Sequence, residues 1–159
     1  MTPKFIIEQI ALYPRDPVAA IELLTAIGLS EWARDHVAAR GVVFGVPGYN
    51  EADLAFNYQA TSDKPLELEV LHYTEGPNWM ETYAHSASHL AMHVTAEELV
   101  GWKAFFALRD IDIAQSVFTE SHTNPVIAGK RSYNYVIFDT RAILGIDLKF
   151  IVRRDIEQA

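Results

Sequence analysis

The pattern of apolar and polar positions predicts a strand followed at once by a helix at the start of the chain. Residues Phe5–Tyr13 alternate and are rich in β-branched and aromatic types, which is typical of a strand. Asp16 is a good N-cap, Pro17 suits the first helical turn, and Gly28 is a suitable stop. The expected apolar stripe of this helix comprises Val18, Ile21, Leu23, Leu24 and Ile27.

Three further strands are expected before the middle of the chain. They cover Val37–Val46, Asp53–Ala60 and Leu66–Tyr73. The sequences Pro47–Asn50 and Thr61–Pro65 between them are strong turn signals. The first half of the chain therefore reads as one strand, one helix and three strands.

The same order restarts at residue 89. His89–Val94 predicts a strand, and Thr95 with Glu98 forms a capping box at the start of a helix. The apolar stripe of that helix comprises Leu99, Trp102, Phe105 and Phe106. Three strands are expected after it, at Ala114–Glu120, Ser132–Phe138 and Ile146–Val152. We therefore predict an α+β fold in which residues 1–73 and 89–159 form two βαβββ modules joined by a linker at residues 74–88.

Polar side chains occupy the strand faces that point away from the predicted helices. Since side chains alternate along a strand, these positions share one interior. They are Gln9, Glu67, Glu69, His89, His93 and Lys149. Such a face would be costly if it were closed and dry, so we expect it to line a cavity. Glu67 and Glu69 share a face, and either could be the inward carboxylate.

Composition limits the chemistry. The chain has no cysteine, which excludes disulfides, zinc–thiolate sites and cysteine nucleophiles. A metal would need His, Glu, Asp or Gln ligands. The net charge of −8 argues against a nucleic-acid partner. We find no apolar run long enough to span a bilayer and no signal peptide, and we therefore expect a cytoplasmic protein without a membrane partner.

The stretch Gln9–Asp16 (QIALYPRD), followed by a helix that ends at Gly28–Leu29, resembles the opening of the vicinal oxygen chelate superfamily. This superfamily includes glyoxalase I, extradiol dioxygenases, methylmalonyl-CoA epimerase, and fosfomycin and bleomycin resistance proteins. The resemblance extends over nearly the whole chain as paired modules. It implies mixed sheets that curve around a central cup, together one glyoxalase-like domain, and a small-molecule substrate. It leaves open whether one chain or a homodimer closes the cup, and we favour a homodimer.

In that superfamily a divalent metal lies in the cup, and its ligands come from the first and last strands of each module. The corresponding positions here are Gln9, Glu69, His89 and Lys149. Lys149 stands where a glutamate is usual, and a charged ammonium cannot ligate a metal. The resemblance therefore implies a three-ligand site for Zn, Ni, Mn or Fe at Gln9, Glu69 and His89. Alternatively, Lys149 replaces the metal by pairing with Glu69, and no metal is bound.

Two functions follow from these alternatives. The first is a metal-dependent lyase, isomerase or dioxygenase acting on a small organic substrate, with Glu69, Lys149 and His93 as catalytic residues. The second is a metal-free small-molecule binding or antibiotic-resistance protein that sequesters its ligand. In either, Tyr133 and Tyr135 with Arg131 would bind a carboxylate or aromatic substrate, unless the tyrosines only pack within the sheet.

Overall fold

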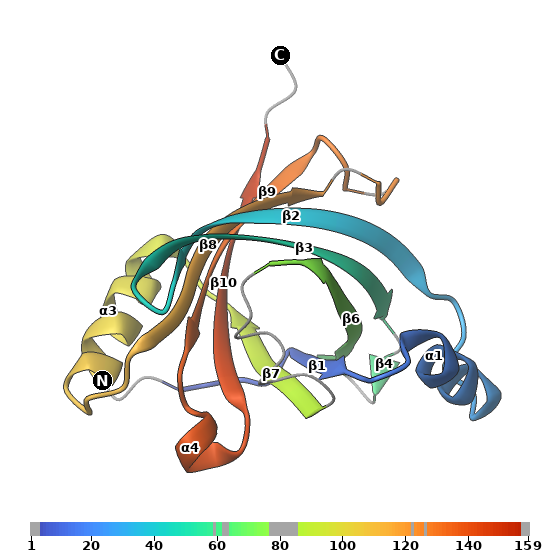
Figure 1. Ribbon diagram of the computed structural model, residues 1–159, viewed down its shortest axis with the longest axis horizontal. Coiled ribbons are helices and arrows are strands. Elements are labelled where there is room, and N and C mark those ends of the chain that lie inside the picture. The colour runs from blue at the N-terminus through green and yellow to red at the C-terminus, as the bar shows by residue number, and fades with distance from the viewer. Residues whose placement is uncertain are drawn as a thin grey trace.

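Eight of the described strands form one closed barrel around a central lumen (Figure 1), and two short strands pair separately. The structure is a computed structural model that describes residues 4–58, 60–61, 64–76, 86–121, 123–125 and 127–156. The elements of the first half are β1 (Gln9–Tyr13), α1 (Pro17–Ala26), β2 (Ala33–Val43), β3 (Val46–Asn57), the short pair β4 (Ala60–Thr61) and β5 (Lys64–Pro65), and β6 (Glu67–Glu75). Those of the second half are β7 (Ser86–His93), α3 (Ala96–Ala107), β8 (Ile113–Ser121), β9 (Arg131–Phe138), α4 (Arg141–Leu144) and β10 (Asp147–Asp155).

The barrel order is β1-β6-β3-β2-β8-β9-β10-β7, and it confirms the predicted α+β fold. In each half the first strand pairs in parallel with the last strand, while antiparallel pairs β1–β7 and β2–β8 join the halves. A single chain thus closes the cup. The homodimer that we favoured stays a prediction.

The pairing register repeats between the two halves. Gln9 pairs with Glu67 as His89 pairs with Asp147, and Ala11 pairs with Glu69 as Ala91 pairs with Lys149. Gln9 and His89 are therefore equivalent positions, and so are Glu69 and Lys149. This equivalence is what brings the four predicted positions into the same lumen.

The buried face of α3 was predicted from its sequence better than that of α1. The capping box of α3 is formed, and Leu99, Trp102 and Phe106 are buried against the outer face of the second half's sheet. Asp16 caps α1 by accepting a hydrogen bond from the Ala19 N–H at 3.0 Å. The predicted stripe of α1 is only partly correct, because Val18, Leu23 and Ile27 are exposed and Ile21 is the residue that is buried.

The predicted turn at Pro47–Asn50 is wrong. The chain reverses at Phe44 and Gly45, where φ is 45° and 76°, and residues 47–50 lie within β3. This two-residue loop brings Gly41 opposite Gly48. The strands around the predicted linker are longer than expected, and its central residues 77–85 lie outside the described residues. In the described part of the chain, no helix has the length and apolarity that crossing a membrane requires.

Candidate functional site

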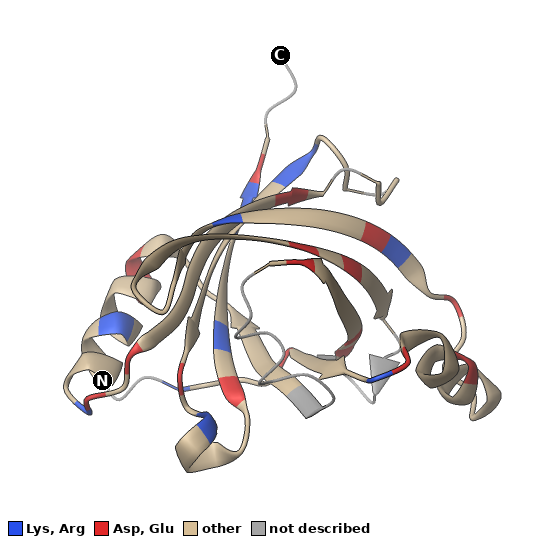
Figure 2. Cartoon of the chain, viewed as in Figure 1, with Lys and Arg blue, Asp and Glu red and all other residues tan. Residues whose placement is uncertain are grey.

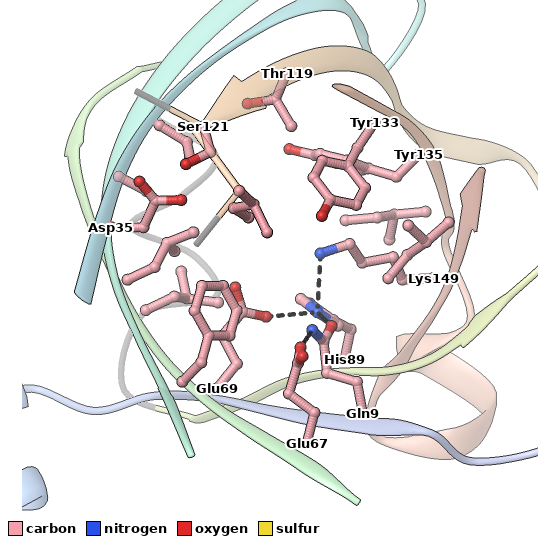
Figure 3. Close-up of a pocket in the computed structure, with 18 of the residues that line it drawn as sticks. Gln9, Asp35, Glu67, Glu69, His89, Thr119, Ser121, Tyr133, Tyr135 and Lys149 are labelled. Atoms are coloured by element: carbon pink, nitrogen blue, oxygen red, sulfur yellow. Dashed lines mark hydrogen bonds and ion pairs between the residues drawn. The ribbon is translucent and has the colours of Figure 1, made fainter. Parts of the chain in front are cut away.

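The lumen of the barrel contains a cavity of about 130 Å³ (Figure 3). A volume of this size holds on the order of ten water molecules or a small organic group. Its walls are largely apolar and aromatic. Polar side chains lie on two sides of it, with Gln9, Glu67, Glu69 and His89 across from Asp35, Thr119 and Ser121 (Figure 3). The lining polar and aromatic residues include Gln9, Asp35, Phe56, Tyr58, Glu67, Glu69, Tyr73, His89, His93, Thr119, Ser121, Tyr133, Tyr135 and Lys149. The sequence left open which of Glu67 and Glu69 is the inward carboxylate, and in the structure both face the cavity.

Three polar groups converge on Nε2 of His89. Gln9 Oε1 lies 3.0 Å from it, Glu69 Oε2 lies 3.2 Å from it, and Lys149 Nζ lies 3.3 Å from it. The Gln9 amide also donates through its Nε2 to Glu67, so that it links this second carboxylate of β6 to the histidine. Glu69 and His89 are each only 3% exposed. The cluster is therefore shielded from water and its electrostatic interactions are strong.

Burial and Lys149 together hold His89 neutral. Burial is the main cause that lowers the pKa of His89 to about 4, and the nearby ammonium adds to it. Burial alone would raise the pKa of Glu69, but Lys149 and His89 outweigh it, and the pKa lies below its usual range. Glu69 is thus a carboxylate at neutral pH. Burial raises the pKa of Glu67 to about 7, although the Gln9 hydrogen bond opposes this.

The donor types around His89 Nε2 fit a divalent first-row metal. They are a neutral imidazole nitrogen, an amide oxygen and a carboxylate oxygen. Glu69 Oε2 is buried and accepts no hydrogen bond from the described residues, which leaves it available to a cation. The Ser88 hydroxyl lies 3.2 Å from His89 Nδ1 and would orient the ring. Lys149 opposes a metal, because its ammonium lies 3.3 Å from the same imidazole nitrogen and would repel a cation there.

Lys149 points into the cavity between His89 and the tyrosines of β9 (Figure 3). Its Nζ lies 4.6 Å from the centre of the Tyr135 ring. Within the described part of the chain it forms no ion pair with a carboxylate. The contact with Glu69 that a metal-free site predicts is therefore indirect, since both groups meet at His89 Nε2.

The remaining predicted residues divide between the cavity and the surface. Tyr133 and Tyr135 line the cavity. Arg131 does not line it, and its Nε lies 3.3 Å from Asp155 Oδ1. His93 lines the cavity, and its Nδ1 lies 3.0 Å from Oε2 of Glu8. Glu8 Oε2 also accepts a hydrogen bond from the backbone N–H of His93 at 2.6 Å, so one carboxylate oxygen contacts both the ring and the backbone of His93.

Glu8 and Asp35 were not predicted from the sequence to belong to the site. Asp35 lies just before the predicted second strand, and its Oδ1 accepts hydrogen bonds from Thr123 Oγ1 at 2.9 Å and the Asn124 N–H at 3.1 Å. It thereby anchors the loop after β8 beside the cavity. An acidic residue directly before a strand and facing its inward side was the available signal. Glu8 lies within the predicted strand Phe5–Tyr13, where alternation assigns it to the face opposite Gln9. In the structure β1 begins only at Gln9, so alternation does not apply to Glu8.

Comparison with known proteins identifies the fold and nothing finer. No protein-family profile matches the sequence, and no curated protein is significantly similar to it. Two variants of Streptomyces coelicolor methylmalonyl-CoA epimerase in complex with 2-nitronate-propionyl-CoA have TM-scores of 0.53 and 0.52. Their sequence identities are 11% and 10%, with coverage of 92% and 99% of this chain and 95% and 100% of theirs. A methylmalonyl-CoA epimerase in complex with methylmalonyl-CoA and NH4+ has a TM-score of 0.51, at 10% identity over 92% of both chains. The chain has the vicinal oxygen chelate fold.

Proposed function

We propose that the protein is an isomerase-type enzyme that moves a proton at the carbon beside the carbonyl of a small organic substrate in the barrel cavity. The observation that carries this proposal is the buried Glu69–His89–Lys149 cluster in a cavity with apolar walls. Removing a proton next to a carbonyl places negative charge on the carbonyl oxygen. A preorganised cation in a water-poor site is the arrangement that stabilises such charge.

Lys149 supplies that cation. Its ammonium faces the cavity and would donate a hydrogen bond to the substrate oxygen as charge develops there. Glu69 supplies an opposite charge close to Lys149, and His89 Nε2 lies 3.3 Å from Nζ. Tyr133 and Tyr135 would contact the body of the substrate from β9. Arg131 would reach a substrate carboxylate only after leaving Asp155.

His93 and Glu67 are the proton carriers of this proposal. β1 lies between their strands, so they come from opposite sides of β1 and both line the cavity. The Glu8 carboxylate favours the tautomer with the proton on His93 Nδ1, which leaves Nε2 as the base. A carrier on each side lets one group remove the proton and the other return it.

A divalent metal is the second possible electrophile. Gln9, Glu69 and His89 would hold Zn, Ni, Mn or Fe, and when bound the metal would polarise a substrate oxygen as a Lewis acid. We favour an isomerase over a dioxygenase, because the cluster has one histidine where an extradiol iron site needs two. A lyase would use the same proton carriers and is the closer alternative.

The charges of the cavity favour a small substrate without phosphate groups. Three carboxylates and one ammonium line it, namely Asp35, Glu67, Glu69 and Lys149. A coenzyme A ester carries several negative charges that would find only Lys149. The CoA ligands named for the similar structures are therefore not the substrates that we propose here.

A metal-free binding or resistance protein is the second candidate function. The position of Lys149, next to the imidazole nitrogen that a metal would use, favours it. Such a protein would hold a carbonyl or anionic ligand at Lys149 without proton transfer.

Hydrogen–deuterium exchange separates the candidates. A panel of 2-oxo acids, 3-oxo acids and short acyl thioesters is incubated with the protein in D₂O, and loss of the α-proton is followed by NMR. We expect catalysed exchange for at least one small carbonyl compound, a large loss of rate in Lys149→Met, and a smaller loss in His93→Gln. Binding without exchange would support the second candidate. Elemental analysis of protein purified without chelator, and rescue by added Mn, Ni, Fe or Zn, decides between ammonium and metal.

A further inference from the structure

A second cavity lies outside the barrel, in a groove of about 380 Å³ beside α3. Its walls are α3 and the outer faces of β2, β8, β9 and β10, on the side of the sheet that faces away from the lumen. The charged, polar and aromatic side chains of the groove include those of Arg40, Lys103, Ser116, Phe118, Asn134 and Arg154. They come from five elements that are distant in the sequence, so the groove is a product of the fold.

The groove is positively charged although the chain carries a net charge of −8. Arg40, Lys103 and Arg154 line it, and no aspartate or glutamate of the described part of the chain does. Among the described residues none of these three cations takes part in an ion pair, whereas Arg131, Arg141 and Arg153 are each paired with an aspartate. Figure 2 shows basic positions on α3, along β2 and towards the end of β10. Three unpaired cations around one concave surface attract an anion.

The neutral side chains of the groove narrow the class of anion. Ser116 and Asn134 offer hydrogen-bonding groups between the cations. Phe118, which is 42% exposed, gives the groove an apolar and aromatic wall. A bare inorganic ion would use the cations and leave this wall in water. A ligand with an aromatic part and more than one negative charge would use both.

We propose that this groove binds a small organic phosphate of the nucleoside diphosphate class, separately from the lumen. Two arginines provide planar donors that match phosphoryl oxygens, and Lys103 adds a third charge from α3. The aromatic base packs on Phe118. The overall negative charge of the protein disfavours nucleic acid and anionic membranes, which leaves a ligand small enough to be enclosed by the groove.

Isothermal titration with ADP and with inorganic phosphate tests the proposal on the full chain. We expect ADP to bind, inorganic phosphate to bind more weakly, and affinity for ADP to fall as salt is raised. The double variant Arg40→Gln/Arg154→Gln should weaken ADP binding at least about tenfold, and Lys103→Gln should weaken it less. Arg153→Gln is the matched control, because its guanidinium pairs with Asp155, and it should bind as the wild type does.

Other outcomes overturn the proposal. They are no heat of binding at low salt with millimolar ADP, equal affinity for phosphate and ADP, or an unchanged affinity in the double variant. Loss of ADP binding in Lys149→Met would place the ligand in the lumen instead. If Lys149→Met still binds ADP, the proposed site in the groove is supported even where the proposed isomerase activity is not found.

Discussion

At the scale of single residues, the positive charge of Lys149 opposes the binding of a cation next to Glu69 and His89. Replacing it with glutamate would remove the ammonium and add a carboxylate next to Glu69 and His89. Two unit charges about 4 Å apart interact by roughly 4 kcal/mol at a partly buried site, so this change strongly favours a divalent cation. We expect Lys149→Glu to bind Zn or Mn at least about tenfold more tightly than the wild type does, measured by competition with a coloured chelator.

Lys149→Met is the matched control for that experiment, since it removes the charge without adding a ligand. Its metal affinity should lie between those of the wild type and Lys149→Glu. If Lys149→Glu binds metal no more tightly than Lys149→Met, the four positions do not form one site.

Two buried groups of the lumen, His89 and Glu67, have pKa values that are shifted in opposite directions. The pKa of His89 is about 4 in the folded protein against 6.5 for the free side chain, so His89 makes the fold less stable as pH falls from 6.5 towards 4. The pKa of Glu67 is about 7 against 4.5, so Glu67 makes the fold more stable as pH falls from 7 towards 4.5. In the wild type the two contributions oppose each other.

Replacing either residue should reveal the pH dependence of stability that the other residue contributes. In Glu67→Gln the free energy of unfolding should fall by up to about 3 kcal/mol between pH 6.5 and 4.5, relative to the wild type. In His89→Gln it should rise by a similar amount over the same range. Urea unfolding followed by circular dichroism at both pH values measures this difference. Parallel pH profiles in all three proteins would contradict the assigned pKa shifts.

The residues that the sequence could place are those fixed by strand alternation. Gln9, Glu69, His89 and Lys149 share the lumen because each lies on the inward face of its strand, and two-residue alternation determines that face. The distances between them depend on the register of β1 with β6 and of β7 with β10, which the repeat only suggested. Contacts such as Glu8 with His93 depend on a residue outside regular structure, so no pattern predicts them.

At the scale of elements, strands β2 and β8, which join the two halves of the barrel, approach each other closely at Gly41. A Cβ atom at this position would lie 2.0 Å from the backbone oxygen of Ser116, in the β2–β8 pair that joins the two halves. We expect Gly41→Ala to destabilise the fold by roughly 3 kcal/mol, because the strands must separate to admit the methyl group. Gly101→Ala is the control, since a Cβ at Gly101 meets nothing within 4 Å and α3 would gain roughly 1 kcal/mol of helix propensity.

Thermal unfolding of the two glycine variants measures both effects. The midpoint should fall in Gly41→Ala and rise in Gly101→Ala. An unchanged midpoint in Gly41→Ala would contradict this prediction, because it would mean that β2 and β8 can move apart without loss of stability.

Helix starts were predictable and one hairpin was not. Asp16 and the Thr95–Glu98 capping box act through the nearest backbone N–H groups, so the local sequence is sufficient. The sequence predicted the turn at Pro47–Asn50, which has the stronger turn composition, whereas the chain reverses at Phe44–Gly45. Pairing of β2 with both β3 and β8 overrides that local preference, because it holds residues 46–50 in an extended strand.

At the scale of the whole molecule, the two-module fold was predictable because the chain repeats its order of elements. How the modules meet was not, since one chain and a homodimer can make the same cup from the same modules. The structure pairs β1 with β7 and β2 with β8 within one chain. Any homodimer must therefore use outer surfaces, and light scattering of the intact 17.9 kDa chain tests for it.

Closure within one chain leads to a last prediction. A specific protease site placed within residues 77–85 would allow the connection between the halves to be cut after folding. The cut protein should still elute as one species on size exclusion, because two antiparallel strand pairs and the shared lumen hold the halves together. Each half alone would leave β1 and β2, or β7 and β8, with unpaired edges, and we expect it to aggregate when separated in urea and diluted alone. Halves that separate without denaturant, or that fold alone as soluble monomers, would show that the barrel consists of two independent domains.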